Sequence, residues 1–100
     1  MTPSLTRIPE TVQRDIEHAT MILKAGGCRA VFLFGSAATG TMHAGSDLDL
    51  AVRGCPPQHF FHLLGRLLAD LEHPVDLVDL DVPGPFVEFL LANGTLVQLG

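Results

Sequence analysis

The chain has 100 residues, enough for one domain with a hydrophobic core but little more. Hydrophobic residues make up 47% of it, which is high for a small free monomer and indicates that a partner or a second copy covers part of the surface. The net charge is −5 and the six Lys and Arg residues are scattered singly, so nucleic-acid binding, which needs clustered cations, is not expected. No apolar run approaches the roughly 18–20 residues of a membrane span and no signal-peptide core is present, so we expect a cytoplasmic protein whose Cys28 and Cys55 are reduced thiols.

The chain is expected to begin with a lead-in over residues 1–8, followed by a single domain over residues 9–100. A helix is predicted to begin at Pro9, because proline suits the first helical turn, and to end at the glycines 26–27. Apolar residues recur along it at the spacing of one helical face: Val12, Ile16, Ala19, Ile22 and Leu23. This helix therefore has one face suited to packing on a core.

Two short apolar segments predict two strands. Residues 29–34 are apolar and bounded by glycines, which is typical of a buried strand. Residues 35–45 are small and turn-rich, with room for one short helical turn after Ser36. A second strand is predicted over residues 47–53 and is ended by the Gly-Cys-Pro-Pro segment 54–57. The connection between the strands, of about a dozen residues, fits either a tight crossover or an antiparallel return.

A long helix and a third strand follow. The prolines of the preceding segment open a helix that reaches about Glu72, and Pro74 prevents its continuation. Its apolar stripe is wider than contact with one sheet requires: Phe60, Leu64, Leu67 and Leu71, with Phe61, Leu63 and Leu68 beside them. Residues 75–80 predict a strand, residues 86–92 a shorter helix and residues 95–99 a final extended segment. The predicted fold is α/β (α+β), a small mixed β-sheet with helices packed against it.

Two carboxylates stand one residue apart in the second predicted strand. Asp47 and Asp49 share one face of it, because side chains alternate along a strand, and lie roughly 7 Å apart. Two acids in an otherwise apolar strand repel each other unless a cation lies between them. Mg²⁺ prefers such oxygen ligands, and two metal ions roughly 3.5–4 Å apart stabilise the attacking and leaving oxygens of a phosphoryl transfer. An Asp-x-Asp pair also occurs on ordinary solvated strands, but the apolar neighbours here favour a metal site.

A third acid is expected to converge on this pair from a neighbouring strand. Asp76 is the best candidate, because it lies near the start of the third predicted strand between apolar residues. Asp79 and Asp81 fall on the opposite face of a regular strand, so they are interpreted as solvated acids at a strand end.

Gly35 and Ser36 follow the first predicted strand, at a point where exposed backbone N–H groups and a hydroxyl can hold a phosphate. A glycine after a strand also marks any tight turn. No Walker lysine follows, so this is not a P-loop. His43, in the loop before the acids, is a further candidate contact for a nucleotide or substrate.

The spacing of these residues resembles a known signature. Gly35-Ser36, ten further residues and then Asp47-Leu48-Asp49 resemble the Gly-Ser-x10-Asp-x-Asp signature of the DNA polymerase beta-like nucleotidyltransferase superfamily.

The resemblance covers residues 9–99 and is most like the minimal, stand-alone branch of that superfamily. The strand over residues 75–78 and the closing segment over residues 86–99 carry this part of the match. Members of this branch typically act as antitoxins paired with a HEPN-domain toxin, and some adenylylate a tyrosine of that partner. The resemblance therefore implies a helical HEPN-type partner.

The resemblance also implies a role for each matching residue. Gly35 and Ser36 would bind nucleotide phosphates. Asp47 and Asp49 would hold Mg²⁺, and the site would contain two such ions. Asp76 would complete the metal site and activate the attacking hydroxyl. The implied reaction transfers AMP from ATP with pyrophosphate leaving, and its catalysis consists mainly of positioning and charge neutralisation.

One residue departs from the family pattern. Thr39 stands where the family commonly has Arg, and threonine cannot bind phosphate bidentately. Arg53 is the next Lys or Arg after Thr39 along the chain. Three hypotheses follow: an active transferase that modifies a partner protein, a weak or inactive module that neutralises its partner by binding, and a transferase for a small molecule. The small size of the chain speaks against the third, and self-association stays open.

Overall fold

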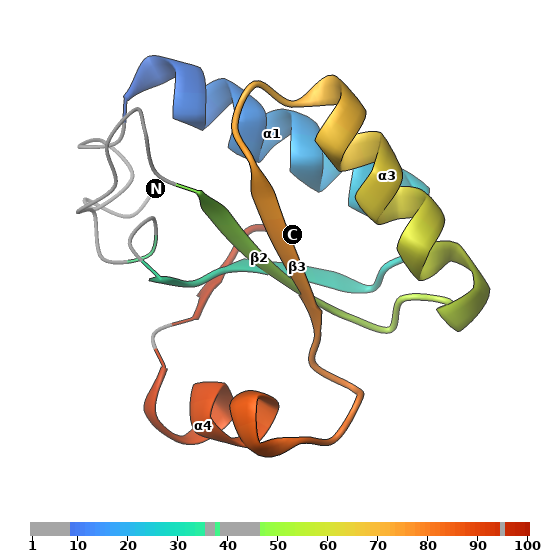
Figure 1. Cartoon of the computed structure of the whole chain (residues 1–100), viewed down its shortest axis with the longest axis vertical. Coiled ribbons are helices and arrows are strands. Elements are labelled where there is room, and N and C mark those ends of the chain that lie inside the picture. Colours follow the sequence, from blue (N-terminus) through green and yellow to red (C-terminus); the bar gives the residue numbers. More distant parts are fainter. Residues whose placement is uncertain (1–8, 36–37, 39–46, 95) are drawn as a thin grey trace.

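The computed structural model describes residues 9–35, 38, 47–94 and 96–100. Within these residues four strands form a mixed sheet in the order β3-β2-β1-β4, and helices cover both of its faces (Figure 1). α1 and α3 lie against one face and α4 lies against the other. The bounds are α1 Glu10–Ala25, β1 Ala30–Leu33, β2 Leu48–Arg53, the 3-10 helix η2 Pro57–His59, α3 Phe60–Asp70, β3 Val75–Asp79, α4 Pro85–Asn93 and β4 Val97–Gln98. The predicted α+β class is confirmed.

α1 follows the predicted helix closely at both ends. Pro9 immediately precedes it, and Val12 on its inner face is fully buried. At its C-terminal end the N–H of Gly26 donates to the carbonyl of Ile22 at 3.0 Å. Gly27 has a φ of +102°, a left-handed conformation that glycine adopts without strain. The two glycines therefore end the helix and turn the chain into β1.

The strand pairing decides between the two connections that the sequence left open. β1 and β2 are antiparallel, with Ala30 opposite Arg53 and Leu33 opposite Leu50, so the connection is an antiparallel return. β2 and β3 are parallel and are joined through η2 and α3, because parallel strands require a crossover. β4 pairs with the other side of β1, also antiparallel.

The second predicted helix is divided into two elements. Residues 57–59 form η2, and α3 then ends at Asp70, two residues before the expected end. Leu63 and Leu67 of α3 are buried, whereas Phe61 and Leu68 remain 78% and 55% exposed. The apolar stripe is thus wider than packing requires, as predicted. No helix in the described part of the chain has the length and apolar character needed to cross a membrane.

β2 is buried on both faces of the sheet, and the neighbours of its apolar residues show on which face Asp49 lies. Leu48 and Leu50 pack with the residues of α1 and α3, whereas Ala51 packs with Leu90 of α4. Because alternate residues of a strand face opposite sides, Asp49 lies on the α4 side of the sheet.

Candidate active site

The two carboxylates predicted to converge from neighbouring strands do so. Asp49 of β2 is directly paired with Asp76 of β3 in the parallel register, so both side chains lie on the α4 face of the sheet. Neighbouring strands run about 4.8 Å apart, which brings paired side chains into contact. Asp49 is half-buried and Asp76 is exposed, while Asp47 is exposed one residue before β2 begins.

The electrostatics of this pair are dominated by burial and by repulsion between the carboxylates. Burial, followed by repulsion from Asp76 and then from Asp47, raises the pKa of Asp49. A hydrogen bond between the carboxyls of Asp49 and Asp76 acts in the same direction, and such a bond requires one of the two to hold a proton. The pair therefore favours any cation that can replace this proton.

Gly35 lies directly against Asp49. The N–H of the preceding residue, Phe34, donates to the carbonyl of Asp49 at 3.1 Å. Gly35 has a φ of +69°, and a Cβ at this position would collide with Oδ2 of Asp49 and lie 3.2 Å from its Cγ. Only a residue without a side chain allows the turn after β1 to approach the carboxylate this closely.

The donor set at this position fits Mg²⁺ in its chemistry. Asp49 and Asp76 offer oxygen ligands, and their mutual repulsion is the cost that a divalent cation would relieve. Within the described residues no group of three or more His, Cys, Asp and Glu side chains is arranged to hold a metal ion. The structure thus brings together two of the three predicted ligands, with Asp47 close enough to repel Asp49.

Several predicted features lie outside the described residues. These are Ser36, with the short helical turn expected after it, and the loop residues Thr39 and His43. The predictions made for them stay predictions.

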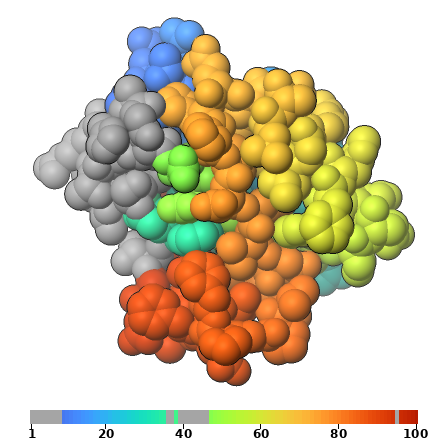
Figure 2. Space-filling view, viewed as in Figure 1, coloured from blue at the N-terminus to red at the C-terminus, as the bar shows by residue number. Residues whose placement is uncertain are grey.

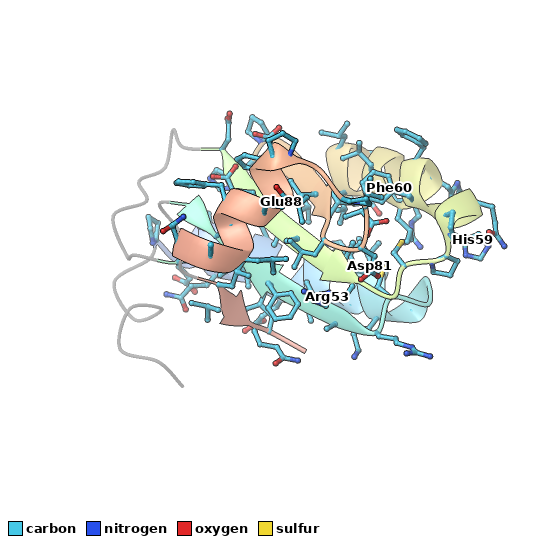
Figure 3. The ribbon with its side chains drawn as sticks, turned by 90° about the horizontal axis from the view of Figure 1, so that it is seen from below. Arg53, His59, Phe60, Asp81 and Glu88 are labelled. Atoms are coloured by element: carbon cyan, nitrogen blue, oxygen red, sulfur yellow. The ribbon has the colours of Figure 1, made fainter. Side chains whose placement is uncertain are left out.

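The acids at the far end of β3 belong to a different arrangement. Asp79 lies on the opposite face from Asp76, as the alternation predicted. Asp81 accepts hydrogen bonds from the N–H of Gly54 at 2.6 Å and from the Arg53 guanidinium at 3.2 Å (Figure 3). It therefore links the segment after β3 to the end of β2 and is no freely solvated acid. Arg53 lies four residues along β2 from Asp49, roughly 13 Å away. Its guanidinium is paired with Asp81, at the opposite end of β2 from Asp49.

One contact near the site was not predicted. The ring of Phe86, at the start of α4, packs edge-to-face on Phe34 with ring centroids 6.0 Å apart. It anchors the first turn of α4 beside the strand end that leads to Gly35. The apolar composition of α4 is a signal for packed aromatic residues, but the partner of Phe86 depends on where α4 crosses the sheet.

The comparison with known protein families gives a match over most of the chain. Residues 17–98 match the family model described as polymerase beta, nucleotidyltransferase. No curated protein matches the chain.

Solved structures share the fold. A protein described as a minimal nucleotidyltransferase is 27% identical with a TM-score of 0.66, over 91% of this chain and 93% of its own. A toxin-antitoxin complex with AMP-PNP contains a chain that is 26% identical with a TM-score of 0.64, over 81% of this chain and 70% of its own. A complex of a tri-AMPylated Shewanella oneidensis HEPN toxin with an MNT antitoxin contains one that is 22% identical with a TM-score of 0.60, over 84% and 69%.

The sheet order, the paired acids beside a strand-end glycine and the match over residues 17–98 agree with one another. The chain belongs to the polymerase beta nucleotidyltransferase family.

Proposed function

We propose that this protein is a Mg²⁺-dependent nucleotidyltransferase that transfers AMP from ATP to a hydroxyl group of a partner protein, and that the partner is a HEPN-type toxin. The observation that carries the proposal is the contact between Asp49 and Asp76 beside Gly35, in a chain of the nucleotidyltransferase family. The pair supplies concentrated negative charge where a triphosphate and its cations would meet the chain.

Each site residue has a role in this proposal. Gly35 and Ser36 would bind the nucleotide phosphates, and Asp47, Asp49 and Asp76 would hold Mg²⁺. When bound, Mg²⁺ neutralises the charge of the triphosphate and of the leaving pyrophosphate. Asp76 is exposed, so an acceptor hydroxyl can reach its carboxylate and give up a proton to it. The acceptor oxygen then bonds to the α-phosphorus as the bond to pyrophosphate breaks.

The similar solved structures support the choice of nucleotide and partner. One similar complex holds AMP-PNP, an analogue of ATP. In the Shewanella complex a HEPN toxin carries AMP groups and is bound to its MNT antitoxin. A HEPN-type partner bound to this protein would also account for its high hydrophobic content, because the partner would cover the exposed apolar side chains.

The proposal is tested by transfer of label from α-labelled ATP to the HEPN-type partner that the proposal assigns to this chain. We expect labelling that requires Mg²⁺ and falls at least about 100-fold in Asp49→Asn and in Asp76→Asn, because each change removes a carboxylate from the reacting centre. Asp70→Asn is the matched control, since Asp70 lies at the end of α3 in a surface ion pair with Arg66. Labelling of equal strength in Asp49→Asn and the unaltered protein would contradict the proposal.

A second candidate function is neutralisation of the partner by binding alone. The exposed apolar residues favour it: Phe61 and Phe89 are 78% and 59% exposed. Under this alternative, Asp49→Asn binds and neutralises the partner as well as the unaltered protein does, and no label is transferred. Loss of neutralisation with binding intact would exclude it.

A further inference from the structure

β3 is an edge strand whose outer side has no neighbour in the described part of the chain. It stands at the end of the sheet order β3-β2-β1-β4. The N–H of Leu48 donates to Pro74 and the N–H of Leu80 donates to Val52, so the even-numbered residues of β3 point their backbone groups toward β2. By the alternation of a parallel ladder, the backbone groups of Val75 and Leu77 point outward.

A hollow lies at the C-terminal half of this open edge, where its lining includes Leu77, Val78 and Asp79 of β3. It has a volume of about 400 Å³, and its walls come from Phe60 of α3 and from the loop and first turn of α4 over residues 82–87, with Leu77 and Asp79 at its floor. An adjoining hollow of about 230 Å³ extends it to Pro57. Figure 2 shows β3 at the surface between α3 and α4. We call this feature the β3 groove.

The rim of the β3 groove is apolar and exposed. Phe61, Val82 and Phe86 keep 78%, 57% and 53% of their surface accessible. An extended segment laid along β3 would present alternate side chains to the two walls, which is how an added strand acquires specificity.

The negative charge of the β3 groove favours an extended segment that carries basic side chains. Asp79 lines both hollows, and no Lys, Arg or His is among the described residues that line either one. The nearby Arg53 is paired with Asp81. A second copy of β3 is a poor occupant, because its Asp76 and Asp79 would be brought against the same acids, and like charges on neighbouring strands are destabilising.

We propose that the β3 groove binds an extended segment of the partner protein, with apolar and basic side chains in alternation, as an added strand. The proposal rests on the proposed function only for the identity of the partner. It needs no nucleotide transfer. Backbone hydrogen bonds to Leu77 in the groove and to Val75 farther along the open edge, apolar contacts at the rim and the charge of Asp79 would supply the binding.

The experiment uses a synthetic peptide of alternating valine and lysine, followed through the amide NMR signals of the full chain. We expect shifts and slowed hydrogen exchange centred on Val75 and Leu77, and weaker binding of the matching valine–glutamate peptide. Val82→Arg should weaken binding about tenfold by adding a like charge and removing an apolar contact. Asp79→Asn should weaken it roughly two- to fivefold, the size of one exposed ion pair.

Met21→Arg is the matched control, because Met21 is 70% exposed on α1, whose described contacts lie on the other side of the molecule from α4. Circular dichroism of each variant checks its folding. Shifts centred on another surface, or equal weakening by Met21→Arg and Val82→Arg, would overturn the proposal. Failure of labelling with peptide binding intact would overturn the proposed reaction alone.

Discussion

The buried carboxylate of Asp15 holds together two segments far apart in the sequence. It lies in α1 and accepts hydrogen bonds from the N–H of Glu72 at 3.1 Å, the N–H of His73 at 2.9 Å and Nδ1 of His73 at 2.7 Å. Glu72 and His73 belong to the loop that leads into β3. Asp15 thereby fixes the entry of the strand that carries Asp76.

Asp15 also ties stability to pH. Burial by itself raises the pKa of the Asp15 carboxyl, but the hydrogen bonds from His73 and Glu72 and the attraction of the His73 ring outweigh it and lower the pKa overall. Because the folded value lies below the unfolded one, the ionised group stabilises the fold above about pH 4, and this contribution is lost as pH falls through the folded value.

We therefore expect Asp15→Asn to reduce the free energy of unfolding by about 2 kcal/mol at pH 7, the cost of disrupting a buried hydrogen-bond network. The difference in free energy of unfolding between the variant and the unaltered protein should become smaller as pH falls from 5 toward 2. Urea unfolding across this range measures it, with Glu10→Gln, in an exposed ion pair on the same helix, as control. A difference in free energy of unfolding that stays constant with pH would contradict the link between the ionisation of Asp15 and stability.

The thiol of Cys28 is expected to react slowly because of its surroundings in the fold. Burial, followed by a hydrogen bond and repulsion involving Cys55, raises the pKa of the Cys28 thiol to about 12. The thiolate, which is the reactive form, is therefore almost absent at neutral pH.

We expect iodoacetamide at pH 8 to alkylate Cys28 at least about 100-fold more slowly in the folded protein than in urea, because the thiolate is rare and buried. Peptide mass spectrometry after timed quenching measures the two rates. Alkylation of the folded protein at the rate of a free cysteine would show that the thiol is accessible.

At the scale of the elements, two glycines are expected to respond oppositely to the same substitution. Gly35 lies in the turn after β1, with a φ of +69° and Asp49 directly against it. Gly65 lies within α3, and a Cβ there would meet nothing within 4 Å. The turn after β1 thus requires glycine, and the helix only tolerates it.

Gly35→Ala should lower the free energy of unfolding by about 1–3 kcal/mol and displace Asp49, because the new methyl group strains the backbone and meets the carboxylate. Gly65→Ala should raise it by about 0.5–1 kcal/mol, the gain in helix propensity. Thermal unfolding of both variants tests this, and label transfer should fall only in Gly35→Ala. Equal stability of the two variants would contradict the strained turn.

The helices and strands could be predicted from local sequence patterns, and most of their ends were predicted as well. The glycines 26–27 stop α1, and proline opens η2 and α4, because these residues act on the backbone directly. The division of residues 57–70 into η2 and α3 was not predicted, since the apolar periodicity runs through both.

At the scale of the whole molecule, the sheet has a different character at its centre and at its edge. β2 is buried between α1 and α3 on one side and α4 on the other, whereas β3 is mostly half-buried or exposed. The site and the β3 groove both depend on this edge position: Asp76 is accessible, and the outer side of β3 is open to a partner.

The sequence by itself determined the order of helices and strands, the α+β class and the candidate acids. These follow from periodicity, from turn residues and from the spacing of Gly35, Asp47 and Asp49, all of which act over short distances along the chain. Only the tertiary structure decided that β1 and β2 are antiparallel, that Asp49 is opposite Asp76 and that β3 is the edge. Strand partners and register arise from long-range packing of both sheet faces, which no local pattern encodes.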